Sequence, residues 1–267
     1  MKTNRPLQAI RNFLLFMLIS GSFIFFLAKC GKRAFRYAER FYQERREVAR
    51  NYNLPGFGIA MPTQYLVHGI DISHYQDVID WSAVADMNVQ GIKIDFVFIK
   101  ATEGRESQDP HFAYNWRESR RQSLLRGAYH FYRPNVNSNY QAENFIQTVS
   151  MESGDLPPIL DIEITGKYSM DNTRAGLQNW LNIIEAHYGV RPIIYTNLHY
   201  YQDHLKGYFD DYPLWIAQYG RDDLNLDKKA WLFWQHSDRG LMNGVAGFVN
   251  FDVFNGSLQS LKALSKP

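Results

Sequence analysis

The chain has 267 residues, of which 45% are hydrophobic, 15% aromatic and 21% charged, and its formal net charge is +2 at pH 7. Residues 1–50 hold 11 Lys and Arg against 3 Asp and Glu, so the rest of the chain is mildly acidic and its charge gives no support for nucleic-acid binding. A single cysteine, Cys30, excludes an internal disulfide and a cysteine-based metal site.

The first 30 residues are typical of a signal anchor. Residues 13–28 carry no charge and follow Lys2, Arg5 and Arg11. The run is shorter than the roughly 20 residues that cross a bilayer core, but flanking basic side chains can reach the interface. We expect residues 1–30 to form an uncleaved transmembrane anchor with the rest of the chain outside the cytoplasm, in the periplasm or at the cell surface. Secretion after signal cleavage is the alternative.

Residues 31–66 are predicted to form a charged juxtamembrane helix and a linker. Apolar residues recur at helical spacing among the charges of 31–53, and prolines and glycines interrupt 54–64. The catalytic or binding domain is therefore expected to occupy residues 67–267.

Strand-like and helix-like stretches alternate from residue 66 onward. The expected strands are 67–72, 96–100, 127–132, 159–164, 192–195, 214–218, 231–236 and 248–253. The expected helices are 81–87, 110–125, 139–151, 173–188 and 200–205. This alternation predicts an α/β fold with a parallel sheet. Five strand–helix units followed by three strands indicate an eight-stranded, TIM-like barrel whose last helices are reduced. An open, doubly wound sheet is the alternative.

Two acids on the fourth expected strand are the first candidates for catalysis. Asp161 and Glu163 lie two positions apart among apolar residues, so they point to the same face of a buried strand. Burial and mutual repulsion are expected to raise one pKa and leave the other group ionised, which suits a general acid beside a carboxylate. Two solvated acids at a strand end, or a metal site, would explain the same spacing.

Other polar and aromatic residues fall near the ends of the expected strands, where barrel enzymes place their sites. Asp71, Glu103 and Asp252 add further acids. The candidate substrate contacts are Tyr129, His130, Tyr132, Tyr195, Trp215, Gln218, Tyr219, Gln235 and Glu103. A cleft of carboxylates walled by aromatic rings is what glycoside hydrolysis requires. Taken singly, His130 and Trp215 also fit a core role, and Glu103 fits a solvated loop.

Seven segments resemble, in order, those of the family 25 glycoside hydrolases, which are lysozymes (N-acetylmuramidases). They cover about residues 67–256. The matching segments are His68–Ser73, Phe98–Gly104, Gly127–Tyr132, Pro158–Glu163, Ile194–Asn197, Leu214–Tyr219 and Trp234–Gln235.

The resemblance implies a (β/α)5(β)3 barrel that cleaves the β-1,4 bond after N-acetylmuramic acid in peptidoglycan. It implies that Glu163 is the acid/base, Asp161 its neighbouring carboxylate and Asp71 the acid of the first strand. Asp252 corresponds to an acid near the C-terminus. The family usually has Val-Asp-Leu-Asn there, whereas this chain has Phe-Asp-Val-Phe over 251–254, which leaves Asp252 less well supported.

The resemblance further implies a substrate-assisted, retaining mechanism, in which the 2-acetamido group attacks the anomeric carbon and Asp161 stabilises its positive charge. An inverting mechanism, with Asp161 activating water, is the alternative. No metal or cofactor is expected, since no pair of histidines has metal-site spacing. The expected partners are peptidoglycan strands and, through the anchor, a membrane, with the protein a monomer.

Other functions remain open from the sequence alone. A chitinase-like barrel also pairs carboxylates on its fourth strand, but it carries a further Asp where this chain has Ile159. A membrane-anchored protein that binds glycans without cleaving them would use the same barrel. A structural membrane protein fits poorly with one short apolar segment.

Overall fold

The computed structural model describes residues 56–224 and 226–267. The expected anchor over 1–30 and the juxtamembrane helix over 31–53 therefore lie outside the described residues. Within the part that is described, no helix has the length and apolar character needed to cross a membrane.

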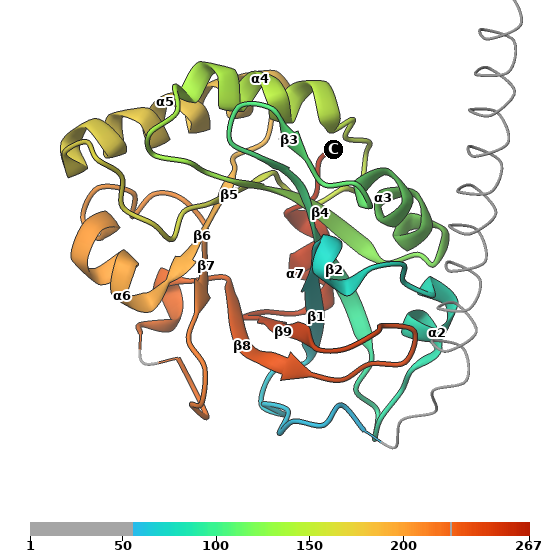
Figure 1. Ribbon diagram of the computed structural model, residues 1–267. Helices are drawn as coiled ribbons and strands as arrows, with labels where there is room; N and C mark the ends of the chain where they lie inside the picture. The colour runs from blue at the N-terminus through green and yellow to red at the C-terminus, as the bar shows by residue number, and fades with distance from the viewer. Residues whose placement is uncertain (1–55, 225) are drawn as a thin grey trace, which may run out of the picture. The chain divides into compact units, whose positions relative to one another are not determined.

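Eight strands close into a barrel (Figure 1). They are β1 (Val67–Ile72), β2 (Ile94–Glu103), β4 (Leu125–Phe131), β5 (Ile159–Asp161), β6 (Ile193–Asn197), β7 (Leu214–Ala217), β8 (Phe233–Gly240) and β9 (Val249–Phe254). The sheet runs β1-β9-β8-β7-β6-β5-β4-β2, and β1 pairs with β2 to complete the circle. A two-residue strand, β3 (Ser107–Gln108), extends β2 as a hairpin. The predicted eight-stranded barrel is confirmed, and the open sheet is excluded.

The last strand differs from the parallel sheet that the alternation predicts. β9 is antiparallel to both of its neighbours, β8 and β1, while the other barrel pairs are parallel. Only residues 241–248 connect β8 to β9. A connection this short can form an antiparallel hairpin but cannot carry the chain back for a parallel strand.

A helix follows each of the five parallel strands β1, β2, β4, β5 and β6. These helices are α2 (Trp81–Asp86), α3 (Phe112–Arg121), α4 (Ser138–Thr148), α5 (Met170–Tyr188) and the short α6 (Leu198–Tyr200), which continues as a π-helical turn over Tyr201–Leu205. The Asp80 side chain caps α2, and Gly189 ends α5 with a φ of 72°. α5 begins at Met170 rather than at residue 173, because the Ser169 side chain accepts the capping hydrogen bond from Asn172 N.

Two boundaries change the setting of the site. β5 ends at Asp161 rather than at Ile164, so Glu163 lies in the loop that follows the strand. The segment predicted as linker up to residue 66 is packed against the barrel from residue 56. Phe57 is buried against Phe251, with ring centroids 5.1 Å apart, and Leu241 N donates to Phe57 O at 2.7 Å.

Aromatic rings fill the barrel interior. Phe98 lies at the centre, with ring centroids 5.1 Å from Phe96, 5.0 Å from Phe233 and 4.5 Å from Trp215. A Cβ atom at Gly127 would come within 2.9 Å of the Phe98 ring, which explains the glycine. Truncation of a buried phenylalanine typically costs about 3–5 kcal/mol, so this layer fixes the positions of the strands.

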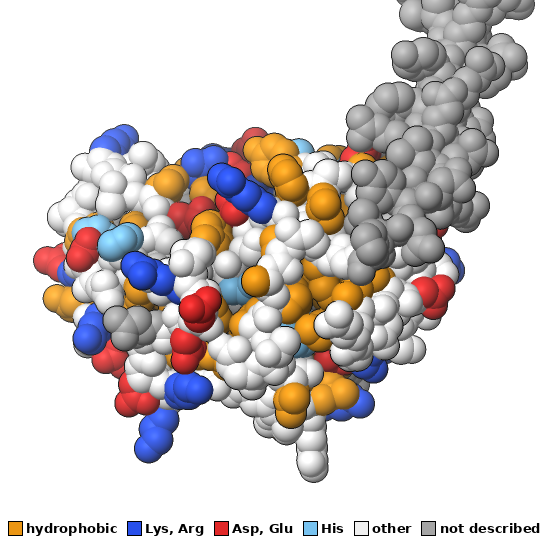
Figure 2. All heavy atoms as spheres, turned by 90° about the horizontal axis from the view of Figure 1, so that it is seen from below, with side chains coloured by type: hydrophobic (Ala, Val, Ile, Leu, Met, Phe, Trp, Pro, Cys, Tyr) orange, Lys and Arg blue, Asp and Glu red, His pale blue; other side chains and the backbone are white. Residues whose placement is uncertain are grey.

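A last helix, α7 (Leu258–Ala263), was not predicted from the sequence. Its Leu261 is buried in the same cluster as Val67 and Phe254, near the amino end of β1, so α7 closes that end of the barrel. The opposite end, where the parallel strands finish, is left for a site. On the face shown in Figure 2, acidic and basic side chains are interspersed, with apolar side chains between them.

Candidate active site

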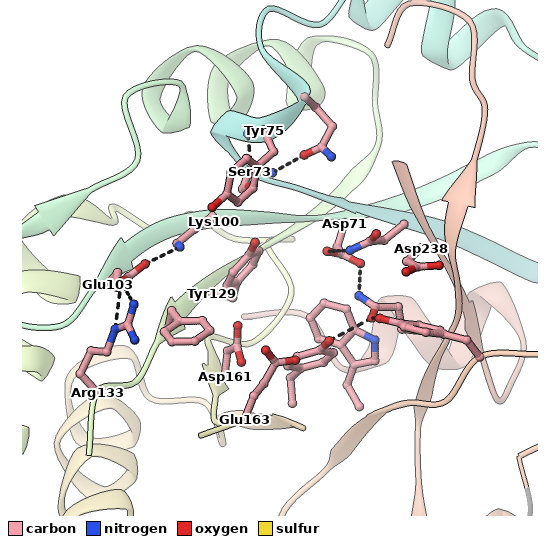
Figure 3. Close-up of a pocket in the computed structure, with 17 residues that line it drawn as sticks. Asp71, Ser73, Tyr75, Lys100, Glu103, Tyr129, Arg133, Asp161, Glu163 and Asp238 are labelled. Atoms are coloured by element: carbon pink, nitrogen blue, oxygen red, sulfur yellow. Dashed lines mark hydrogen bonds and ion pairs between the residues drawn. The ribbon is translucent and has the colours of Figure 1, made fainter. Parts of the chain in front are cut away.

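A pocket of about 420 Å³ opens at the carboxyl ends of the parallel strands (Figure 3). It is lined by Asp71, Ser73, Tyr75, Gln76, Lys100, Glu103, Tyr129, Phe131, Arg133, Asp161, Glu163, Tyr195, Trp215, Tyr219, Gln235, Asp238 and Asn250. Each strand of the barrel contributes a side chain or the residue that follows it. Five of the lining residues are acids and two are basic, so the pocket has a negative charge at neutral pH.

Asp161 and Glu163 lie together on the floor of this pocket (Figure 3). Asp161 is the last residue of β5 and is buried, and its Oδ1 has no hydrogen-bond partner among the described residues. Burial raises the pKa of Asp161 well above its usual range, and the Glu163 charge raises it further. Burial also raises the pKa of Glu163, although a hydrogen bond with Tyr195 and the charge of Lys100 oppose the shift. Two carboxyls in this setting favour holding a proton between them at neutral pH.

Asp71 is held by two amides. Asn250 Nδ2 donates to Asp71 Oδ1 at 3.0 Å, and Gln235 Nε2 donates to Asp71 Oδ2 at 2.5 Å. Asn250 is directly opposite Asp71 in the antiparallel pairing of β1 with β9. Burial raises the pKa of Asp71 to about 6, and the two amide hydrogen bonds oppose that shift because they favour the ionised form.

Gln235 connects three further residues of the pocket. Its Oε1 accepts hydrogen bonds from Tyr195 Oη at 2.9 Å and from Tyr219 Oη at 2.5 Å, while its Nε2 faces Asp71. Only this orientation of the amide lets Gln235 donate to Asp71 and accept from both tyrosines, so the network fixes the Gln235 side chain. The two phenols are thereby oriented on the wall beside Glu163.

Asp252 lies behind this wall and has no exposed surface. Its Oδ1 accepts a hydrogen bond from Trp215 Nε1 at 2.8 Å, and its buried Oδ2 has no hydrogen-bond partner among the described residues. Burial and the Asp71 charge raise the pKa of Asp252 well above its usual range. Asp71 has two amide donors that favour its ionised form, whereas Asp252 has one donor and no exposed surface, so Asp252 is the member of this pair that holds a proton more tightly.

An ionic cluster forms the far wall, opposite Asp238 (Figure 3). Lys100 Nζ lies 2.6 Å from Glu103 Oε2, and Arg133 Nε donates to Glu103 Oε1 at 2.9 Å. Burial raises the pKa of Glu103, but the hydrogen bonds from Lys100 and Arg133 outweigh it and hold the pKa below its usual value. Both cations also lie over the Phe131 ring, at 5.2 Å and 4.7 Å.

The structure brings nine of the predicted site residues to the pocket: Asp71, Glu103, Tyr129, Asp161, Glu163, Tyr195, Trp215, Tyr219 and Gln235. Four others do not line it. Asp252 lies behind Asp71, and Tyr132 lines a separate surface pocket beside Gly176. The Gln218 backbone oxygen accepts from Trp234 Nε1, and the Gln218 side chain is not part of the lining.

His130 also lies away from the pocket, because its ring points to the outer face of β4. Its Nδ1 lies 2.7 Å from Thr102 Oγ1, its Nε2 lies 3.1 Å from Gln141 Oε1, and its ring stacks on Trp180. Burial lowers the pKa of His130 to about 4, so it is a neutral core histidine at pH 7.

Eight lining residues were missed by the sequence reasoning: Ser73, Tyr75, Gln76, Lys100, Phe131, Arg133, Asp238 and Asn250. Two of them carried a usable signal. Lys100 is a charged residue inside an otherwise apolar strand, and Asn250 is two positions from Asp252 on the same strand. Of the others, Ser73 and Arg133 follow strands, Tyr75 and Gln76 lie in a 3₁₀ helix over His74–Gln76, Phe131 ends β4, and Asp238 lies in β8. Among the described residues, no group of three or more His, Cys, Asp or Glu side chains could hold a metal ion.

Comparison with known proteins agrees with this geometry. The sequence profile of glycosyl hydrolases family 25 matches residues 70–245. The chain is 47% identical over 207 residues to YegX of Escherichia coli K12, which covers 78% of this chain and 76% of that protein. It is 34% identical over 216 residues to lysozyme M1 of Streptomyces globisporus, which covers 74% of this chain and 71% of that one.

Solved structures give the same result. A family 25 glycosyl hydrolase from Bacillus anthracis superposes with a TM-score of 0.70 and 28% identity, over 80% of this chain and all of that one. A bacterial lysozyme from Streptomyces coelicolor superposes with a TM-score of 0.67 and 32% identity, over 75% of this chain and 97% of that one. With its barrel and its sequence both matching, the chain belongs to family 25 of the glycosyl hydrolases and is a glycoside hydrolase.

Proposed function

We propose that this protein hydrolyses peptidoglycan at the β-1,4 bond that joins N-acetylmuramic acid to N-acetylglucosamine. The observation that carries the proposal is the pair of carboxyls, Asp161 and Glu163, on the floor of an open pocket whose walls carry Tyr129, Tyr195 and Trp215. Paired carboxyls supply the acid and the charge stabilisation for glycoside cleavage, and aromatic walls provide apolar surface for sugar rings. The relatives named lysozyme support the same substrate.

Glu163 is the proposed acid/base. It lies in the loop after β5, is partly exposed, and has a raised pKa, so it can carry a proton near neutral pH and deliver it to the glycosidic oxygen. Tyr195 hydrogen bonds to it and thereby orients the carboxyl group.

Asp161 is the proposed charge-stabilising group. Asp161 lines the pocket, and its buried Oδ1 has no partner among the described residues, so a small rotation of the carboxyl group would offer an unused acceptor to a donor on the substrate. The N–H of a 2-acetamido group would fill this position, which favours the ionised form of Asp161 and leaves the proton on Glu163. The acetamido oxygen then attacks the anomeric carbon and the glycosidic C–O bond to the leaving sugar breaks. Glu163 protonates the glycosidic oxygen of the leaving sugar. Glu163 later removes a proton from water as the water oxygen bonds to the anomeric carbon and the bond to the acetamido oxygen breaks, so the N-acetyl group is restored and two displacements leave the configuration retained.

We further propose that the barrel acts outside the cytoplasm and is held at a membrane through residues 1–30. The uncharged run over 13–28 and its basic flanks support this arrangement. Fractionation tests it: the full chain should stay with membranes in high salt and be released by detergent, whereas a chain lacking residues 1–30 should be released without detergent. A mature N-terminus near residue 30 would contradict the anchor.

Digestion of purified, insoluble peptidoglycan tests the hydrolase directly. The full chain in detergent should release soluble fragments, and Glu163→Gln should lower the rate by about 10²- to 10⁴-fold, the usual loss when a general acid/base is removed. Glu143→Gln is a matched control, because this glutamate is on the surface of α4 outside the pocket. Binding of peptidoglycan without release of fragments would favour a glycan-binding protein instead.

A further inference from the structure

A second pocket lies next to the active site, and it is built from neutral side chains. It has a volume of about 320 Å³ and lies between the loop after β4 and the first turns of α4 and α5. Amides, hydroxyls and an aromatic ring make up most of its surface: Tyr132, Asn135, Asn137, Ser138, Tyr168 and Asn172. We call it the amide pocket. None of the residues that line it is a lysine, arginine, aspartate, glutamate or histidine.

The amide pocket continues the line of the active site. In Figure 3, Arg133 marks the end of the active site opposite Asp238. Arg133 lines the first pocket, and the next residue, Pro134, lines the second. On the other wall, Tyr168 follows Glu163 by five positions, a span of at most about 18 Å for an extended chain. A polymer bound across Asp161 and Glu163 that leaves the site past Arg133 would reach the amide pocket within a few sugar residues.

The frame of the amide pocket is fixed by hydrogen bonds. Lys167 N donates to Asn135 Oδ1 at 2.7 Å, which joins the loop after β5 to the loop after β4. Asn179 Nδ2 donates to Ser138 Oγ at 2.9 Å, which joins α5 to the start of α4. The pocket is therefore formed before a ligand arrives, which lowers the entropy cost of binding.

The neutral, polar lining of the amide pocket favours some chemical groups of a peptidoglycan strand over others. A stem peptide carries carboxylates and amines, whereas the side chains that line this pocket carry no charge. The nearby ammonium group of Lys167 lies over the Tyr168 ring, 5.2 Å from its centroid. An anion is also disfavoured at the adjoining helix ends, because Asn137 and Ser169 side chains already accept from Asn139 N and Asn172 N. An N-acetylated sugar is neutral, and its hydroxyl and acetamido groups match amide side chains. Its apolar ring face matches Tyr168, which is 49% exposed.

From this geometry we infer that the amide pocket is a distal subsite for a neutral N-acetylated sugar of the glycan strand. The inference rests on the proposed function, and it adds that the enzyme holds long strands better than short ones. The subsite would raise kcat/KM on long strands through binding energy that is remote from the reacting bond. This binding energy is present in the transition state as well as in the ground state.

The test compares long glycan strands, stripped of their stem peptides, with a tetrasaccharide, which places only two sugars on the Arg133 side when its central bond is cleaved. For the wild-type chain, kcat/KM should be higher on the long strands. Tyr168→Ala should lower the long-to-short ratio about tenfold, which corresponds to about 1.4 kcal/mol. Asn172→Ala should lower it in the same direction. Tyr208→Ala is the matched control, since Tyr208 is an exposed tyrosine with a cation–π contact to Arg174 and lines neither pocket.

A binding measurement separates this inference from the proposed function. In the Glu163→Gln background, the Kd for long stripped strands should rise about tenfold when Tyr168→Ala is added. If the wild type binds strands without cleaving them, the proposed function fails and the Kd still tests the subsite. A ratio and a Kd that Tyr168→Ala leaves unchanged would overturn the subsite, as would a length preference that disappears when stem peptides are removed.

Discussion

The indole nitrogen of Trp215 donates a hydrogen bond to Asp252 Oδ1 over 2.8 Å, and it holds this carboxyl group behind Asp71 with no exposed surface. Asp252 therefore cannot touch a bound substrate. The pKa of Asp252 is raised further above the usual range than that of Asp71, so Asp71 is the member of the pair that ionises first. From this arrangement we expect Asp252, which the sequence placed among the catalytic acids, to act by positioning Asp71.

Asp252→Asn should therefore keep most of the activity. Asparagine can accept from Trp215 Nε1 through its oxygen and donate to Asp71 through its amide nitrogen, as protonated aspartate can. We expect kcat within about tenfold of the wild type, since a single altered hydrogen bond is worth about 1 kcal/mol. Asp252→Leu should be far worse, because it leaves the Trp215 N–H buried without a partner. Steady-state kinetics on peptidoglycan fragments measures both. A loss with Asn as large as that of Glu163→Gln would make Asp252 a proton-transfer group.

The sequence allowed the barrel and most of its pocket to be predicted for one physical reason. Parallel strands bring their carboxyl ends to one rim, so acids and aromatics near those ends, such as Asp71 and Tyr195, meet there. The direction of β9 was not predictable from periodicity, because strand alternation reads the same in both directions. His130 shows a second limit, since alternate residues of a strand face opposite sides of the sheet and a shift by one position moves the ring to the outer face.

Asp161→Asn should stabilise the fold while it abolishes activity. Burial raises the pKa of Asp161 above its unfolded value, so folding costs free energy once pH exceeds the unfolded pKa and the cost is complete above the folded pKa. The amide removes that cost. The increase in Tm over the wild type should therefore grow as pH rises from 5 to 8, by about 2–4 °C for each kcal/mol. Calorimetry across this range provides the test, and a Tm below that of the wild type at pH 8 would contradict it.

The acid and basic limbs of the pH–rate profile should both lie at higher pH than the usual pKa range of carboxyl groups. The two limbs belong to the interacting pair, and the active form carries one proton on the pair. Activity falls as pH rises and the pair loses this proton, and falls as pH drops and the pair takes up a second one. Because substrate N–H donation lowers the pKa of Asp161, the acid limb of kcat should lie below that of kcat/KM.

Lys100 gives this profile a specific check, since its charge lowers the pKa of both carboxyls. Lys100→Met should move both limbs of kcat/KM to higher pH. Lys93→Met is the control, because Lys93 pairs with Asp95 outside the active-site pocket. Limbs that stay in place, or move to lower pH, would show that Lys100 does not act on the pair.

The stereochemistry of the first product separates the two mechanisms. If the acetamido group is the nucleophile, early proton NMR of the new reducing end should show the β anomer. Strands whose muramic acid lacks the N-acetyl group should then be poor substrates for the wild type. An early α anomer, with de-N-acetylated strands still cleaved, would show that Asp161 activates water directly.

The identity of the new reducing end tests the central claim most directly. Purified peptidoglycan is digested with the full chain, the products are reduced with borohydride, and the reduced sugar is identified by mass spectrometry. Cleavage at the proposed bond predicts N-acetylmuramitol in the wild-type digest and almost none with Glu163→Gln. Reduced N-acetylglucosamine as the main product would place the cut at the other glycosidic bond and contradict the account.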